Sequence, residues 1–174
     1  PLINGLITTT FNNNLTSENL TFYNSNELTE YNLNTPSFTT INVPIAQTFT
    51  IGTTGKNITS YLKTITLRLS YSGFINVSIR NVNSSGFPIG SDLITSNNVY
   101  APNNSNLLYN FSFEDTYFQL EQGKQYAMII RFSGSNFGFN FNSSANSYLG
   151  GSRFNSAGSS WSLQNNDIYF LYPL

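Results

Sequence analysis

The sequence predicts an all-β fold in which two antiparallel sheets pack face to face. Three observations lead to this prediction. Hydrophobic and polar residues alternate in several runs, and the spacing typical of helices is almost absent. The runs are short and are separated by turns rich in Asn, Ser and Gly. The chain has 174 residues, of which 16% are aromatic and none is Cys, so it can bury a core that needs no disulfide.

The clearest alternating run lies between residues 62 and 82. Hydrophobic side chains fall on one face of this run and polar ones fall on the other. Ser72-Gly73 interrupts the run at its middle and is a turn signal. The pattern therefore predicts a β-hairpin with one buried face. The residues expected on that face are Ile65, Leu67, Leu69, Tyr71, Ile75, Val77 and Ile79.

Other strands follow from the same alternation. The run that begins at Tyr126 differs, because Ala127 and Ile129 place apolar side chains on its second face as well, which predicts a strand covered on both faces. The residues Glu121–Lys124 before it read as a turn. The remaining strands are expected at residues 45–51, where the compact domain opens, at 107–113, at 137–141, and at 168–172, where it closes.

The first 40 residues have a different character. Residues 1–12 contain one short, uncharged alternating stretch, and residues 13–40 form an Asn-rich linker with the first strands. Residues 41–174 form the sandwich, which we expect to be of jelly-roll or immunoglobulin-like type with an N-terminal extension strand. One face of that extension strand carries Ile3, Gly5, Ile7, Thr9 and Phe11.

An isolated strand can neither pair its backbone groups nor bury its apolar face, so this extension must pair with a sheet. One interpretation makes it the first strand of its own sandwich. The other makes it a donor strand that completes the sheet of a neighbouring, identical subunit. A head-to-tail contact of this kind does not close on itself and builds a filament.

Charge is scarce and evenly mixed. Charged residues make up 9% of the chain and the net charge is −1, so the polar surface must consist mainly of Asn, Ser and Thr. Scattered Lys and Arg make no phosphate-binding patch, and we expect no nucleic-acid partner. No apolar run approaches the length of a membrane span.

Residue types also argue against catalysis. The chain has neither His nor Cys, the commonest general base and the thiol nucleophile. Glu114 and Asp115 are neighbours, and on a strand their side chains would diverge. We therefore expect no enzyme, no catalytic residue, no bound metal and no cofactor.

Sequons for N-glycosylation recur along the chain. Composition alone gives about six such triplets, so their number carries no weight. Their predicted positions are more informative: Asn76 and Asn110 lie on the outward faces of strands, and Asn83 and Asn103 fall in loops. The full set consists of Asn14, Asn19, Asn57, Asn76, Asn83, Asn103, Asn110 and Asn142.

Trp161 is the one Trp of the chain. It follows a Gly- and Ser-rich stretch and could stack on a sugar together with Tyr148, as exposed rings do in glycan-binding sandwiches. The alternative is that Trp161 packs against the end of the sandwich, which is the commoner role of large aromatic side chains.

Two resemblances complete this picture. Residues 45–52, the corner at residues 120–126 and the late Trp161 resemble jelly-roll domains of secreted and viral surface proteins. The uncharged Asn-, Ser-, Thr- and Tyr-rich chain with its apolar leading strand is similar to the thread-filament subunits of thermoacidophilic archaea. That second resemblance implies a glycosylated sandwich whose N-terminal strand, here Leu2–Phe11, inserts into the next subunit.

The leading hypothesis is a non-enzymatic subunit of an extracellular, pilus-like or thread-like surface filament that acts in adhesion and carries N-glycans. The alternatives are a carbohydrate-binding jelly-roll module and a viral capsid or spike protein. The chain starts at Pro1 instead of Met. Removal of a secretion signal and truncation of a longer chain both explain this start, and a surface location favours the removed signal.

Overall fold

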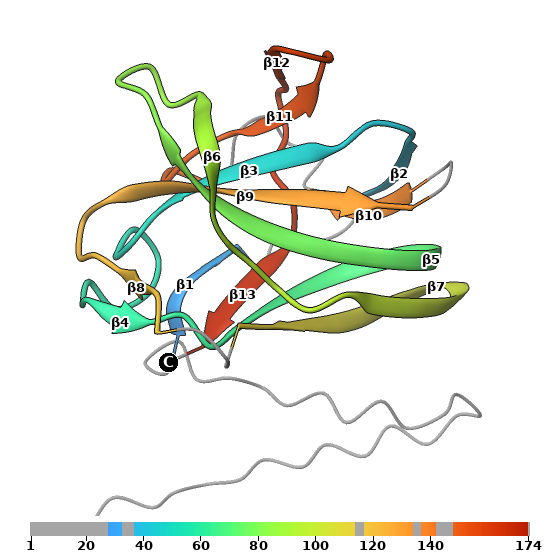
Figure 1. Cartoon of the computed structure of the whole chain (residues 1–174), viewed down its shortest axis with the longest axis horizontal. Coiled ribbons are helices and arrows are strands. Elements are labelled where there is room, and N and C mark those ends of the chain that lie inside the picture. The colour runs from blue at the N-terminus through green and yellow to red at the C-terminus, as the bar shows by residue number, and fades with distance from the viewer. Residues whose placement is uncertain (1–27, 33–36, 114–116, 134–136, 142–147, 174) are drawn as a thin grey trace, which may run out of the picture.

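The protein is all-β and antiparallel in the computed structural model, which describes residues 28–32, 37–113, 117–133, 137–141 and 148–173 (Figure 1). None of the described residues is helical. The strands form one large curled sheet and one small two-stranded sheet. The predicted antiparallel sandwich is therefore confirmed, while the jelly-roll or immunoglobulin-like order of its strands stays a prediction.

The strands that the structure describes are short except for two. They are β1 (Leu28–Asn32), β2 (Ser37–Ile41), β3 (Ile45–Thr50), β4 (Ser60–Tyr61), β5 (Thr64–Val82), β6 (Pro88–Thr95), β7 (Val99–Ser112), β8 (Gln119–Leu120), β9 (Gln125–Phe132), β10 (Phe137–Phe141), β11 (Arg153–Ser156), β12 (Trp161–Leu163) and β13 (Phe170–Pro173).

The long strand β5 serves both layers of the sandwich. Its first half pairs with β7 on one edge and with β13 and β10 on the other. β1 pairs with the outer edge of β13, and β2 pairs with the outer edge of β10. This is the first layer. The second half of β5 pairs with β6 and β9, and the sheet continues through β3 and β11 to β12, which makes the second layer.

The predicted hairpin at Ser72-Gly73 is wrong, because β5 runs through this point as one strand of 19 residues. Gly73 has a φ of 139°, and a side chain there would lie 2.8 Å from the Tyr71 ring. Odd-numbered residues of β5 face the core in both halves, so position 73 lies on the inside of the bend, where only Gly fits. Figure 1 shows β5 and β7 curving together at this bend.

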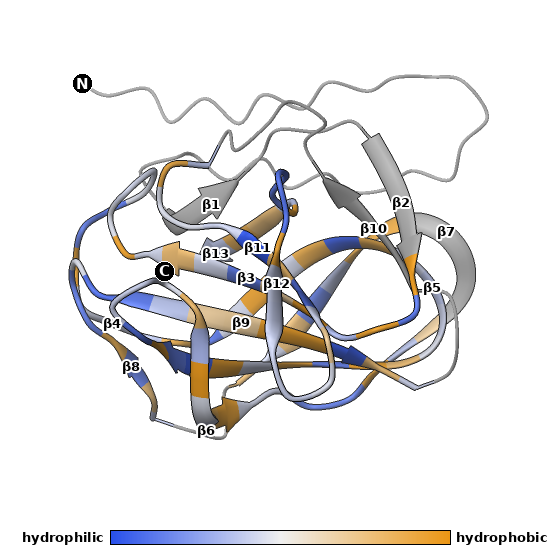
Figure 2. Ribbon diagram, turned by 90° about the horizontal axis from the view of Figure 1, so that it is seen from above, coloured by the Kyte–Doolittle hydropathy of each residue, from blue (hydrophilic) through white to orange (hydrophobic). Residues whose placement is uncertain are grey.

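The main core lies between the two layers. It contains the odd-numbered residues predicted for the inner face of β5, together with inner residues of β3, β7, β9 and β13. Figure 2 shows hydrophobic and hydrophilic residues interleaved along β3, β5 and β9. The large side chains buried deepest are Tyr71, Tyr126, Tyr148, Tyr172, Phe49, Phe111 and Phe170.

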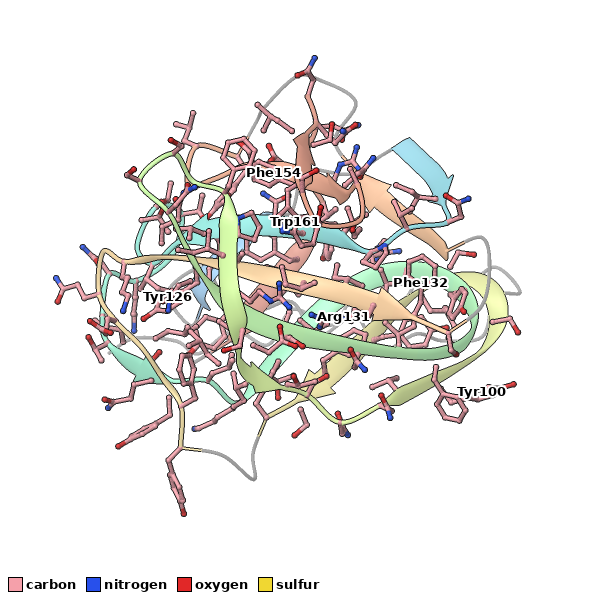
Figure 3. All side chains as sticks on the ribbon, turned by 45° about the horizontal axis from the view of Figure 1, so that its top comes forward. Tyr100, Tyr126, Arg131, Phe132, Phe154 and Trp161 are labelled. Carbon is pink, nitrogen blue, oxygen red and sulfur yellow. The ribbon has the colours of Figure 1, made fainter. Side chains whose placement is uncertain are left out.

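A second, smaller apolar cluster covers the outer face of the second layer. Ala46, Ala127, Ile129 and Phe154 form it, and Val82, Phe87 and Trp161 pack against it. Figure 3 shows Phe154 and Trp161 together beside β3. The prediction that the strand from Tyr126 is covered on both faces is thus confirmed, since five consecutive residues of β9 are buried.

Two local features close the end of the sandwich near β9. The predicted turn at Glu121–Lys124 is present, with a hydrogen bond of 3.1 Å from the Lys124 amide to the Glu121 carbonyl and a φ of 68° at Gly123. Beside it, β4 and β8 pair and bury Leu120. Among the described residues, no helix long and apolar enough to cross a membrane is present.

Candidate functional site

A groove of about 320 Å³ opens on the outer face of the second layer, next to the second apolar cluster. Four separate parts of the chain meet there: the loop between β5 and β6, Thr48 of β3, the start of β9, and the segment from Gly151 to Leu163 that contains β11 and β12. The residues that line it are Thr48, Ser84, Ser85, Gly86, Phe87, Gln125, Gly151, Ser152, Phe154 and Leu163.

The β5–β6 loop forms one wall and is fixed by its own hydrogen bonds. The Asn83 Oδ1 accepts hydrogen bonds from the amides of Ser85 at 3.0 Å and Phe87 at 2.9 Å. The Asn83 backbone pairs with Phe87 and Gly86, and Gly86 has a φ of 80°. Ser84 and Ser85 are exposed in this side-chain-capped turn, and Phe87 packs onto Phe154 with 5.0 Å between the ring centroids.

The opposite wall is fixed to β3. The Thr48 Oγ1 donates to the Ser152 carbonyl at 3.1 Å and accepts from the Ser152 amide at 2.8 Å. Gly151 lies directly against the Thr48 carbonyl, where any side chain would clash. The Gln125 Nε2 donates to the Gly150 carbonyl at 3.1 Å, so the floor of the groove is also tied to this wall.

The chemistry of the groove is uncharged. Its lining combines hydroxyl, amide and backbone groups with Phe87, Phe154 and Leu163, and it contains no Asp, Glu, Lys or Arg. Within the described part of the chain, the Ser84, Ser85 and Ser152 hydroxyls form no hydrogen bond with protein atoms. The groove therefore offers polar groups for a ligand beside apolar surface.

A buried polar network supports the strands beneath the groove. Asp167 is fully buried, and its two oxygens accept from Gln47 Nε2 at 3.0 Å and from the Tyr148 amide at 3.1 Å. Burial raises the pKa of Asp167, and these hydrogen bonds and the charge of Arg153 only partly oppose the rise. Burial in turn lowers the pKa of Arg153 to about 10, although Asp167 opposes this change. Gln47 also accepts from the Ile168 amide at 3.0 Å, which joins β3 to the chain before β13.

A second polar cluster lies on the same outer face, over β5, β6 and β9. The Asp92 Oδ1 accepts from Arg80 at 2.6 Å and from Arg131 at 3.0 Å, and Arg131 also donates to Ser78 at 2.6 Å. Partial burial raises the pKa of Asp92, but the two guanidinium groups outweigh it and hold that pKa below its usual value. Figure 3 labels Arg131 on β9.

The sequons differ in accessibility. Asn57 and Asn83 are exposed, and the exposed Asn110 accepts a hydrogen bond from Thr66 at 2.7 Å. Asn76 is half-buried and donates to Asn98 at 3.0 Å. Asn103, expected in a loop, lies inside β7 opposite Tyr71. The sequons at Asn14, Asn19 and Asn142 lie outside the described residues.

The two predicted platform residues are separated by the structure. Tyr148 is only 2% exposed, lies in the main core and packs edge-on against Phe170, so its ring has no face for a sugar. This part of the platform prediction is corrected: the apolar core between the layers takes the ring. Trp161 is half-buried at β12 and packs against the second apolar cluster, beside the groove but not in its lining.

Other predicted residues cannot be placed. The donor face, namely Ile3, Gly5, Ile7, Thr9 and Phe11, lies outside the described residues, as do Glu114 and Asp115. Among the residues that the structure does describe, there is no group of three His, Cys, Asp or Glu side chains that could hold a metal ion.

Comparison of the chain with protein-family models, with curated proteins and with solved structures found no match.

Sequence reasoning missed the groove itself. Ser84, Gln125 and Ser152 come from three distant parts of the chain and follow no common spacing. The only local signal was the Asn83–Gly86 turn pattern, which predicts a loop but not the surface it faces. These polar groups line one common surface only after the chain has folded and brought the segments together.

Proposed function

We propose that this protein is a structural subunit of an extracellular filament, in which the strand Leu2–Phe11 of one copy pairs with the sandwich of the next. The observation that carries the proposal is an apolar, uncharged stretch of alternating sequence at residues 2–11, ahead of a sandwich with its own buried core. Such a strand must pair with a sheet edge to satisfy its backbone and bury its apolar face.

The first layer offers the edge that suits such a strand. β13 pairs with only two residues of β5, Thr66 and Leu67, and β10 pairs with the next two, Leu69 and Ser70. By contrast, β9 pairs with β5 over seven residues in the second layer. Within the described part of the chain, β1 and β2 each pair on one edge only, so both leave an outer edge for strand addition.

The direction of the two edge strands fits a single added strand. Both β13 and β10 are antiparallel to β5, and β1 and β2 are antiparallel to β13 and β10, so β1 and β2 run the same way. A donated strand of ten residues could follow both. Burial of Ile3, Ile7 and Phe11 would contribute roughly 1.5–3 kcal/mol each, in addition to the backbone hydrogen bonds.

The surface supports an extracellular role. Few groups titrate, so the surface charge changes little with pH, and the exposed sequons at Asn57, Asn83 and Asn110 are open to glycan attachment. Covalent glycans and identical subunits are the partners that this proposal requires.

The proposal is tested by deleting residues 1–12 and following assembly by size-exclusion chromatography and electron microscopy. The deletion should abolish filaments, and Ile7→Asp should do the same because it places a charge on the donor face. Thr8→Asp, on the opposite face of the strand, is the matched control and should assemble. Filaments formed by the deletion variant, or equal assembly of the two Asp variants, would contradict the proposal.

A synthetic peptide of residues 2–11 gives an independent readout. Added to the deletion variant, it should raise the melting temperature in a concentration-dependent way, because it binds only the folded state. The same peptide with Ile7→Asp should have no effect. If neither peptide changes the melting temperature, the sandwich does not bind this strand.

A further inference from the structure

We propose that the groove between the β5–β6 loop and the β11–β12 segment binds a neutral saccharide. This is a binding function beyond assembly, and it rests on residues remote in sequence from the proposed donor strand.

The lining matches the functional groups of an uncharged sugar. Ser84, Ser85 and Ser152 supply hydroxyls that form no hydrogen bond within the described part of the chain, and each can donate and accept one. Sugar hydroxyls have the same dual capacity. A phosphate or sulfate group would need a cation to pair with, and a metal ion would need carboxylates, and the lining has neither.

Two cationic residues adjoin lining residues in the sequence. Lys124, which precedes Gln125, is paired with Glu121 at 2.7 Å. Arg153 lies between two lining residues, but it is 5% exposed and its guanidinium donates to Asn166 at 2.6 Å and to Asn155 at 2.8 Å. Because side chains alternate along β11, Phe154 faces the outer cluster and Arg153 faces the other way. The positive charge is therefore kept away from the groove.

The apolar part of the groove suits the carbon–hydrogen face of a sugar ring. Leu163 is 52% exposed and half-buried Phe87 packs on the Phe154 ring, so apolar surface lies next to the free hydroxyls. The volume of about 320 Å³ lies at the lower end of the range for ligand pockets, about 300–1,000 Å³. It accommodates one or two sugar units and not a long chain.

The walls are fixed before a ligand arrives. The Asn83 side chain holds the first wall through two amides, and the exchange between Thr48 and Ser152 holds the second. A preformed site loses less conformational entropy on binding, which matters most for small polar ligands that release little free energy per atom.

The test uses saturation-transfer difference NMR with the full-length protein, because the method observes the ligand and tolerates large assemblies. The probes are the methyl glycosides of mannose, glucose, galactose and N-acetylglucosamine, with N-acetylneuraminic acid and galactose 6-sulfate as charged comparators. At least one neutral glycoside should receive saturation, and the charged sugars should receive less.

Two variants target the groove without disturbing its backbone. Ser84→Ala combined with Ser152→Ala removes two hydroxyls and retains every hydrogen bond described above, which use the Ser152 backbone and other residues. It should raise the Kd by about two- to tenfold for each hydroxyl. Leu163→Ser should weaken transfer to the sugar ring protons. Ser72→Ala, exposed at the β5 bend, is the matched control and should leave the Kd unchanged.

Ser85 is left intact because it completes the sequon at Asn83. The absence of transfer from every neutral glycoside would overturn the proposal, and so would a Kd that the double variant leaves unchanged. Sugar binding should persist after deletion of residues 1–12. The sugar-binding proposal and the filament proposal are therefore tested independently, and either can fail while the other holds.

Discussion

Asp167 and Asp92 are two carboxylates of one sandwich in opposite environments. Asp167 is fully buried and receives hydrogen bonds from neutral donors, the Gln47 amide and the Tyr148 backbone. The Asp92 side chain is 30% exposed and receives its hydrogen bonds from two guanidinium groups. Burial raises the pKa of Asp167, whereas Arg80 and Arg131 lower that of Asp92 despite its partial burial.

The difference shows that burial and pairing give opposite pH dependences in a protein with few charges. A carboxyl with a raised pKa stabilises the fold most when protonated, and one with a lowered pKa stabilises it most when ionised. Acidification should therefore strengthen the contribution of Asp167 and remove that of Asp92. Because only 9% of the residues are charged, few other groups mask these two effects.

The largest expected effect follows Asp167→Ala. The variant removes the buried acceptor of one Gln47 Nε2 hydrogen bond and of the hydrogen bond from the Tyr148 amide, and we expect a loss on the order of 3 kcal/mol of unfolding free energy. The contribution of Asp167 is complete below the unfolded pKa, near 3.8, and declines as the pH rises through its higher folded pKa.

Denaturant unfolding of the wild type and Asp167→Ala at several pH values measures this difference. It should be larger at pH 3 than at pH 7. A difference that grows as the pH rises would show that Asp167 is stabilised as an anion, and the contrast with Asp92 would fail.

A smaller loss of stability, with the opposite pH dependence, is expected for Asp92→Asn. The variant loses the charge that Arg80 and Arg131 share, which should cost about 0.5–1 kcal/mol at pH 7. The contribution is present above the unfolded pKa of about 3.8 and is lost as the pH falls through the lower folded value. The same unfolding series should therefore show no cost at pH 2, and high salt should reduce the cost at pH 7.

The smallest effect is expected at the exposed pair of Glu121 and Lys124. Their side chains are 2.7 Å apart, and the hydrogen bond from Lys124 is the main cause that lowers the pKa of Glu121. Glu121→Gln should leave the denaturation midpoint unchanged, because solvent screens the pair. Carbon-13 NMR of the Glu121 carboxyl should still show the lowered pKa, and Lys124→Met should return it to the usual range.

The alternation of side chains sufficed to predict most of the core. Inner residues such as Ile65 and Val77, and the two-sided burial of Ala127 and Ile129, follow from period-two patterns that depend only on local geometry. A method that depends on alternation cannot find a strand that lacks it, and β6 was missed. Its apolar residues Ile89 and Leu93 are both exposed, so this edge strand shows no alternating pattern.

The failed predictions depend on distant contacts. Ser72-Gly73 can turn a chain or bend a strand. The continuous strand is selected by β7, which pairs with β5 before and after the bend, and by β9, which pairs with β5 from Ile75 onward. Tyr148 precedes Gly150 in a segment without alternation, so its burial against Phe170 could not be read locally. Asp167 follows two Asn residues, so the local sequence is typical of an exposed loop. Only the folded structure shows that Gln47 of β3 donates a hydrogen bond to Asp167.

The position of β13 has a consequence for the order of folding. This strand is the last in the described chain, yet it lies between β1, the first, and β5. Leu28 therefore finds its partner Pro173 only when nearly the whole chain is available, whereas β5, β6 and β7 can pair as soon as they are synthesised. During synthesis, the edge next to β5 thus stays unoccupied the longest, and a strand from another copy could compete for it in that interval.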